Sequence, residues 1–136
     1  MGKLIAIVDP FPRTLELIFS KDKFKILRKK YELLYAPKNK KNFFYEKNIH
    51  KASFIIGQPD LPKNLLIKAK KLKAIINVES NFINNMDYQY CFKKGIHVIA
   101  TSPVFSKPVA EIALGMTLSL LRNIHTAHLD FIKGKE

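Results

Sequence analysis

The sequence predicts an α/β fold with a doubly wound parallel sheet, and three observations support this prediction. Short apolar runs recur along the chain, and turn-forming residues close most of them. Segments with helical spacing or helix-capping residues lie between these runs. The alternation continues over most of the 136 residues. This order is typical of βαβ units with right-handed crossovers.

The first half of the chain predicts two strands and two helical segments. Residues 3–8 (KLIAIV) form a continuous apolar run, which Asp9 and Pro10 end. Thr14 can cap the helix that follows. Residues 31–35 are expected to form the second strand, and residues 37–48 a loop that passes into a short helix.

The middle of the chain has more regular turn signals. Residues 53–56 predict a third strand, which Gly57 stops, and Pro62 opens the next helix. Residues 73–78 predict the fourth strand. Polar residues follow both strands, so they are expected at one edge of a parallel sheet, where ligands of such folds bind.

The last strand and the strand order complete the predicted domain. A short helix over residues 88–94 ends at Gly95 in a C-cap position, and residues 96–99 form the fifth strand. For five strands joined by helical crossovers we expect the flavodoxin-like order 2-1-3-4-5.

The closing segment predicts a helix that is apolar on two sides. Pro108 suits the first turn, and Ser106 or Lys107 precedes it as the cap, with Ser106 the better capping side chain. A helix on the surface of a three-layer fold needs one apolar face, so a second face predicts another domain or subunit. The alternative is a helix central to an ordinary core. The two stripes are Val109, Ile112, Ala113, Met116 and Leu120, and Leu114, Leu118 and Leu121.

The charge of the chain does not by itself indicate a nucleic-acid partner. The formal net charge is +13, which would suit a polyanion. However, 21 of the 24 basic residues are lysines, whereas base reading and bidentate phosphate contacts favour arginine. A solvated, lysine-rich exterior is the favoured interpretation, with a nucleic-acid-binding module as the alternative.

The remaining composition points to a cytoplasmic protein without a membrane segment or a metal cluster. The first apolar run is too short for a secretory signal, and no run approaches the ~20 residues of a membrane helix. The single cysteine, Cys91, excludes an intramolecular disulfide. We expect this cysteine to be a small buried side chain.

Three segments in the second half resemble the D-isomer-specific 2-hydroxyacid dehydrogenases. These are NAD(P)-dependent enzymes with a flavodoxin-like substrate domain and a separate dinucleotide-binding domain. The likeness extends from about Ser53 to Glu136. It departs from the family at residues 79–82 (ESNF), because the family usually has glycines in this loop. The segments are residues 72–82 (LKAIINVESNF) with Asp87, residues 95–98 (GIHV), and residues 103–111 (PVFSKPVAE).

The resemblance implies a site for a 2-hydroxy or 2-keto acid. Backbone amides of Glu79, Ser80 and Asn81 would hold the substrate carboxylate, as amides at a strand end can do. Gln58 and Phe105, with their neighbours Pro59 and Ser106, would form walls of the cleft. Pro59 and Phe105 could equally be turn and packing residues, and Glu79 a solvated loop carboxylate. No catalytic or metal-binding residue is expected in this chain.

The resemblance also implies an NAD or NADP site outside this chain. The family carries Gly-x-Gly-x-x-Gly in its second domain, and no such motif occurs here. We therefore expect a substrate domain at residues 1–104 and a crossing helix at residues 105–136, directed toward a missing cofactor domain. The chain alone would be inactive, and the helix at 107–122 would form a homodimer.

A response-regulator receiver domain of degenerate sequence is the alternative function. Asp9, Ser80 and Lys107 match receiver positions after the first, fourth and fifth strands. The acceptor position holds Gln58 in place of an aspartate, and Asp9 has no adjacent acid for magnesium.

Overall fold

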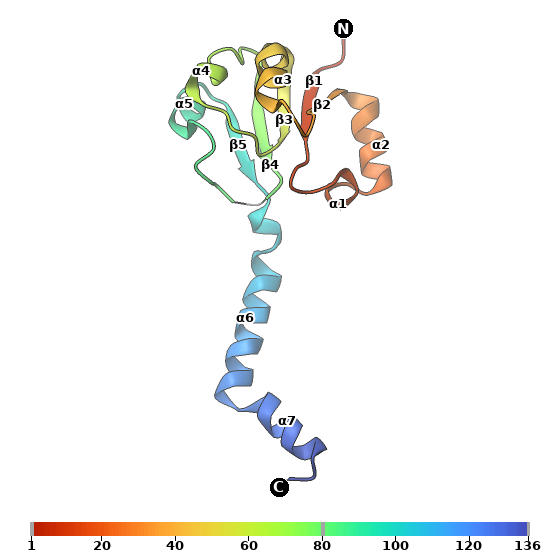
Figure 1. Cartoon of the computed structure of the whole chain (residues 1–136), viewed down its shortest axis with the longest axis vertical. Coiled ribbons are helices and arrows are strands. Elements are labelled where there is room, and N and C mark those ends of the chain that lie inside the picture. The colour runs from red at the N-terminus through yellow and green to blue at the C-terminus, as the bar shows by residue number, and fades with distance from the viewer. Residues whose placement is uncertain (1, 80, 136) are drawn as a thin grey trace. The chain divides into compact units, whose positions relative to one another are not determined.

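The computed structural model describes residues 2–79 and 81–135. The chain divides into two compact units, residues 1–101 and residues 102–136, and each is described by itself. The first unit contains a sheet with helices packed around it, and the second contains two helices (Figure 1).

The first unit is built on a five-stranded, fully parallel sheet with the order β2-β1-β3-β4-β5. This result confirms the predicted fold class and strand order. Because every crossover joins parallel strands, all the carboxyl ends meet at one edge of the sheet. The strands are β1 (Ile5–Asp9), β2 (Glu32–Tyr35), β3 (Ala52–Gly57), β4 (Ala74–Asn77) and β5 (His97–Ala100).

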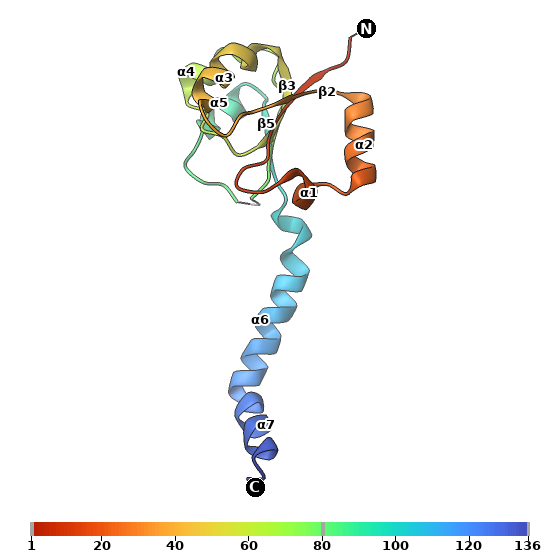
Figure 2. The same ribbon diagram turned by 45° about the vertical axis from the view of Figure 1, so that its right-hand side comes forward.

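Helices fill the connections between the strands. The helices α1 and α2 lie on the β2 side of the sheet, and α4 and α5 lie on the β5 side (Figures 1 and 2). The expected helix after Thr14 is divided in two: α1 ends at Ile18, and Ser20 caps a second helix by accepting a bond from the Lys23 N–H. The helices are α1 (Leu15–Ile18), α2 (Lys21–Lys30), α3 (Lys41–Asn48), α4 (Lys63–Leu66) and α5 (Tyr88–Lys93), with a 3-10 turn at Ile49–Lys51.

The main core of the first unit lies between the sheet and the helices α3 to α5. Ile7, Ile55 and Ile75 point from three adjacent strands into this core and are fully buried. Tyr45 and Ile49 close it from α3 and the following turn. The predicted buried cysteine, Cys91, is part of the same cluster.

Gly57, the last residue of β3, permits the ends of β1 and β3 to approach closely. A Cβ atom added at Gly57 would lie 2.4 Å from the backbone oxygen of Asp9, and the φ angle of the glycine is +156°. We therefore expect Gly57→Ala to lower the free energy of unfolding by about 2 kcal/mol or more through overpacking. Urea denaturation checks this value. Gly95→Ala is the comparison for φ strain alone, since a Cβ there would meet open space.

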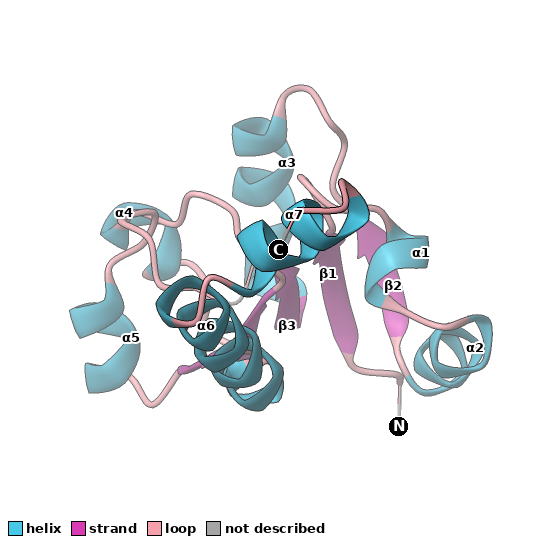
Figure 3. Cartoon of the chain, turned by 90° about the horizontal axis from the view of Figure 1, so that it is seen from below, coloured by secondary structure: helices cyan, strands magenta, loops and turns pink. Residues whose placement is uncertain are grey.

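The second unit contains α6 (Ser106–Leu121) and α7 (Ile124–Ile132), preceded by a 3-10 turn at Ser102–Val104. Seen along its axis in Figure 3, α6 is a continuous helix. The expected cap is wrong, because Phe105 is the N-cap and Ser106 is already helical. The Ser106 hydroxyl instead donates to the Pro103 carbonyl, at 2.9 Å.

The expectation of one crossing helix over residues 105–136 is also wrong, because the structure has two helices there. Asn123 adopts a left-handed conformation with a φ of 51°, and it separates α6, which ends at Leu121, from α7, which begins at Ile124. His125 and His128 therefore lie on α7.

The side chains of α6 are exposed on both apolar stripes. On the first stripe Ile112 is 63% exposed, and on the second Leu114 is 62% exposed. No described residue of α6 or α7 is buried. Within the second unit, α6 is therefore not the centre of a core. Among the residues that the structure describes, no helix has the length and apolar character needed to cross a bilayer.

Candidate functional site

The candidate site is the edge of the sheet where the strands of the first unit end. Asp9 and Gly57 face one another as register partners at the ends of β1 and β3. The fourth strand ends beside them at Asn77. The loops that follow these three strands therefore come together, as the sequence predicts for a parallel sheet.

Gln58 and Asn81, both predicted site residues, contact each other. The Gln58 amide nitrogen Nε2 donates to the backbone oxygen and to Oδ1 of Asn81, at 3.1 Å in each case. The Asn77 Nδ2 donates to the same backbone oxygen of Asn81, at 3.0 Å. Because a carbonyl can only accept, these bonds fix the orientation of both amides. Oε1 of Gln58 and Oδ1 of Asn77 are buried and have no partner among the described residues.

The loop after β3 is also joined to the loop after β4 further along the chain. The Asn85 Nδ2 donates to the carbonyl of Pro59 at 2.8 Å, and the Leu61 N–H donates to the carbonyl of Asn85 at 2.7 Å. Pro59 is buried, which agrees with the turn and packing interpretation of this residue.

Glu79 is paired with a residue that the sequence analysis did not select. Its Oε1 accepts from the Arg13 Nε at 2.6 Å, and its Oε2 accepts from the Arg13 Nη2 at 3.5 Å. The Arg13 side chain is 54% exposed and that of Glu79 is 27% exposed. Glu79 is therefore an ion-paired carboxylate that links the loop after β4 to the loop after β1, rather than a solvated one.

The backbone amides near Glu79 are the expected carboxylate donors. Neither the Glu79 N–H nor the Asn81 N–H donates a hydrogen bond to another described residue. Ser80, the third predicted residue of this set, lies outside the described residues. Phe105, the remaining predicted residue, precedes α6 in the second unit and is 53% exposed there.

A second ion pair, between Asp9 and Lys41, lies at the end of β1. Only 2% of the Asp9 side chain is exposed. Its Oδ1 accepts from the Lys41 Nζ at 2.7 Å, and its Oδ2 accepts from the Tyr45 hydroxyl at 3.3 Å. Burial, together with the facing Asp9 carboxylate, raises the pKa of the Tyr45 phenol above its ordinary value. The Lys41 ammonium also lies 5.0 Å from the centre of the Phe11 ring.

Sequence reasoning missed Arg13, Lys41 and Tyr45. One signal was available for Arg13, because it is one of three arginines and follows a strand end. Lys41 stands in a run rich in lysine, so nothing local distinguishes it from a solvated cation.

The described residues offer neither a metal centre nor an activated cysteine. They contain no group of three or more His, Cys, Asp or Glu side chains placed to hold a metal ion. Burial, with a smaller contribution from Asp87, raises the pKa of the Cys91 thiol, so the reactive thiolate is disfavoured.

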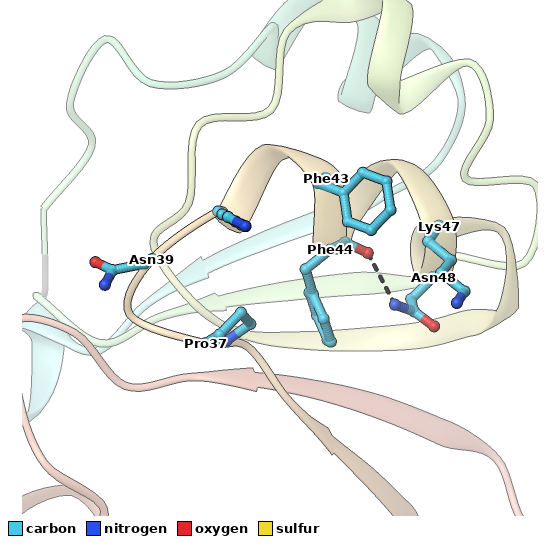
Figure 4. Close-up of a pocket in the computed structure, with 7 residues that line it drawn as sticks. Pro37, Asn39, Phe43, Phe44, Lys47 and Asn48 are labelled. Carbon is cyan, nitrogen blue, oxygen red and sulfur yellow. Dashed lines mark hydrogen bonds between the residues drawn. The ribbon is translucent and has the colours of Figure 1, made fainter.

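A surface pocket of about 440 Å³ lies between the end of β2 and α3 (Figure 4). Phe43 and Phe44 contribute its apolar side. The Asn48 Nδ2 is held by the Phe44 carbonyl at 2.9 Å. No predicted site residue lines this pocket.

The glycines of the chain do not form a phosphate-binding loop. Gly57 packs on Asp9, and Gly95 follows α5 in a left-handed conformation. The other glycines, Gly2, Gly115 and Gly134, are far from these two in the sequence. A dinucleotide pyrophosphate needs several backbone N–H groups in one glycine-rich turn, so the residues present do not fit that group.

Comparisons with known proteins agree with this geometry. The model of the D-isomer specific 2-hydroxyacid dehydrogenase family, catalytic domain, matches residues 6–134. A phosphoglycerate oxidoreductase from Rhizobium etli is 42% identical, with a TM-score of 0.80 over 98% of this chain and 41% of that one. No curated protein gives a significant match.

Two more distant structures share the fold. The PH0520 protein from Pyrococcus horikoshii OT3 is 22% identical, with a TM-score of 0.66 over 99% of this chain and 38% of that one. A 2-hydroxyacid dehydrogenase from Ketogulonicigenium vulgare Y25 is 16% identical, with a TM-score of 0.67 over 98% and 41%. The chain thus spans about two fifths of the length of the solved structures that it matches.

Proposed function

Because this chain belongs to the D-isomer-specific 2-hydroxyacid dehydrogenase family, we propose that it is the substrate-binding part of an NAD(P)-dependent oxidoreductase. The complete enzyme would transfer a hydride between a D-2-hydroxy acid, or its 2-keto acid, and a nicotinamide. The observation that carries this proposal is the match of the catalytic-domain model to residues 6–134. The loops that meet at the carboxyl edge of the sheet support it.

In this proposal the loop after β4 holds the substrate carboxylate. The backbone amides of Glu79 and Asn81, with Ser80 between them, donate to the anion, and Gln58 fixes the loop by its two bonds to Asn81. Phe105 is proposed as a further contact of the substrate. The contribution of the chain is to bind and orient the acid and to exclude water from it.

The cofactor belongs to a separate domain in this proposal, because the glycines here do not form a phosphate-binding turn. When bound there, the nicotinamide accepts or supplies the hydride. The receiver alternative lacks an acceptor carboxylate, since Gln58 follows β3. The family match favours the dehydrogenase.

The 136-residue chain alone is expected not to bind NADH, because its sequence lacks the Gly-x-Gly-x-x-Gly motif that holds the pyrophosphate. Titration of NADH fluorescence should give no saturable change up to about 1 mM, well above the micromolar affinities of functional sites. A dissociation constant in the low micromolar range would contradict the proposed division of labour.

A chimera tests the proposed reaction. Residues 1–136 replace the matched part of the Rhizobium etli protein, and NADH oxidation is followed with glyoxylate, pyruvate and larger 2-keto acids. The remaining part of the Rhizobium protein without this chain is the control. A chimera that binds NADH and reduces none of these acids would refute the proposed function.

The exposed stripes of α6 are proposed to contact the cofactor domain and a second copy of the chain. The helix offers two exposed apolar faces, so two partners can each cover one of them. A homodimer through residues 107–122 is the simplest use of the second face.

A further inference from the structure

We propose that Arg13 is a positioning residue that adapts the loop after β4 to an anionic substrate by neutralising Glu79. This inference rests on the proposed function, in which the same loop binds a carboxylate. It explains how an acidic side chain can occupy a loop whose backbone must attract an acid.

Glu79 lies in the proposed carboxylate-binding loop after β4. The backbone N–H of Glu79 is one of the proposed donors to the substrate. The side-chain carboxylate of the same residue therefore belongs to the site as well. With 27% of the Glu79 side chain exposed, water screens this charge only in part. An unpaired Glu79 would therefore repel an incoming carboxylate.

The geometry of Arg13 matches this task. Its guanidinium contacts both oxygens of Glu79, through Nε at 2.6 Å and Nη2 at 3.5 Å, so it approaches the two-bond arrangement typical of arginine and carboxylate. Arg13 comes from the loop after β1, so the pair also holds two loops of the site together.

The neighbouring charges do not provide a substitute for Arg13. Asp9 and Lys41 form their own pair at 2.7 Å, with the Tyr45 hydroxyl on the other oxygen of Asp9. Among the described residues, Arg13 is the cation bound to Glu79. Removing it would leave the edge of the sheet with one unbalanced negative charge.

A different role for Arg13 makes different predictions. If Arg13 contacted the substrate directly, its loss would weaken binding whether or not Glu79 were charged. If Arg13 only shaped the loop, its loss would weaken binding of neutral and anionic ligands alike. Neutralisation of Glu79 predicts instead that the loss is specific to anions and is reversed by removing the second charge.

The experiment is an NMR titration of the ¹⁵N-labelled 136-residue chain at low ionic strength. Pyruvate is the anionic probe and lactamide is the neutral one, and the backbone amides of Gln58, Glu79 and Asn81 report binding. Four proteins are compared: the wild type, Arg13→Gln, Glu79→Gln and the double variant. Arg28→Gln, at an exposed position on α2, controls for the loss of one arginine elsewhere.

The expected result is a charge-dependent cycle. Arg13→Gln weakens pyruvate binding by roughly 3- to 100-fold, the range for unit charges about 6 Å apart at effective dielectric constants between 80 and 20. Lactamide affinity and the Arg28→Gln variant stay within about twofold of the wild type. The double variant returns to within about threefold of the wild-type affinity for pyruvate.

The outcomes that overturn the inference are distinct from failure of the proposed function. If pyruvate shifts the reporters in the wild type but the double variant stays as weak as Arg13→Gln, neutralisation is refuted. Equal losses for pyruvate and lactamide, or no loss on Arg13→Gln, refute it as well. If pyruvate shifts no amide of this edge in the wild type, both the inference and the proposed carboxylate site fail.

Discussion

Replacing Lys41 with methionine is expected to lower the free energy of unfolding by about 3 kcal/mol, as for other broken buried ion pairs. Methionine keeps the length of the side chain but removes the ammonium that contacts Asp9 at 2.7 Å. The Asp9 carboxylate would then be buried with the Tyr45 hydroxyl as its remaining partner at 3.3 Å. Urea denaturation of the wild type and the variant measures the difference.

The double variant Asp9→Asn with Lys41→Met separates the charge effect from lost packing. An asparagine oxygen can still accept from Tyr45 without a buried charge, so we expect the double variant to recover more than half of the lost stability. Lys47→Met, at an exposed position on α3, should change stability by less than about 0.5 kcal/mol. A loss in the double variant as large as in Lys41→Met would contradict this account of the ion pair.

The sheet could be predicted from the sequence because its strands are encoded locally. The runs that became β1 and β3 are apolar on both faces and end at Asp9 and Gly57, so each strand and its end can be read within a few residues. Chirality then limits the ways in which parallel strands can be joined, which leaves the order 2-1-3-4-5 among few alternatives.

The ends of α6 could not be predicted from the sequence, because they depend on local geometry that the residue types do not specify. Ser106 is a good capping residue in general, but here its hydroxyl is used by the Pro103 carbonyl, and the helix begins one residue earlier than a serine cap requires. Asn123 can continue a helix or adopt a left-handed conformation, and the structure has the second. Asparagine tolerates that conformation better than most residues.

The candidate site was predictable where it follows from strand ends and not where it depends on long-range pairing. Gln58 and Asn81 lie after two strands expected to be neighbours, and they do contact each other. Arg13 and Glu79 are 66 residues apart, and no local pattern links them. The Arg13–Glu79 pair forms only in the folded protein, because the sheet brings the loops after β1 and β4 to the same edge.

The remaining large effect concerns association through α6. We expect the double variant Leu114→Glu and Leu118→Glu to weaken self-association of the chain by at least about 100-fold, because each buried leucine contributes about 1.5–3 kcal/mol and the charges resist burial. Both leucines are exposed in this chain, at 62% and 49%, so their replacement should not disturb the core of the first unit. Sedimentation velocity over a range of concentrations measures association, and urea denaturation checks that stability is retained.

Added negative charge alone should not have this effect. Lys25→Glu with Lys29→Glu places the same two side chains at exposed positions of α2, and this control should associate like the wild type. The two double variants should differ because only the α6 variant removes leucines. In the proposed dimer, a second copy of the chain covers the apolar stripe of Leu114, Leu118 and Leu121. A wild-type chain that stays monomeric at about 100 μM, far above the dissociation constants of stable dimers, would refute the proposed dimer, and α6 would then be left to the cofactor domain alone.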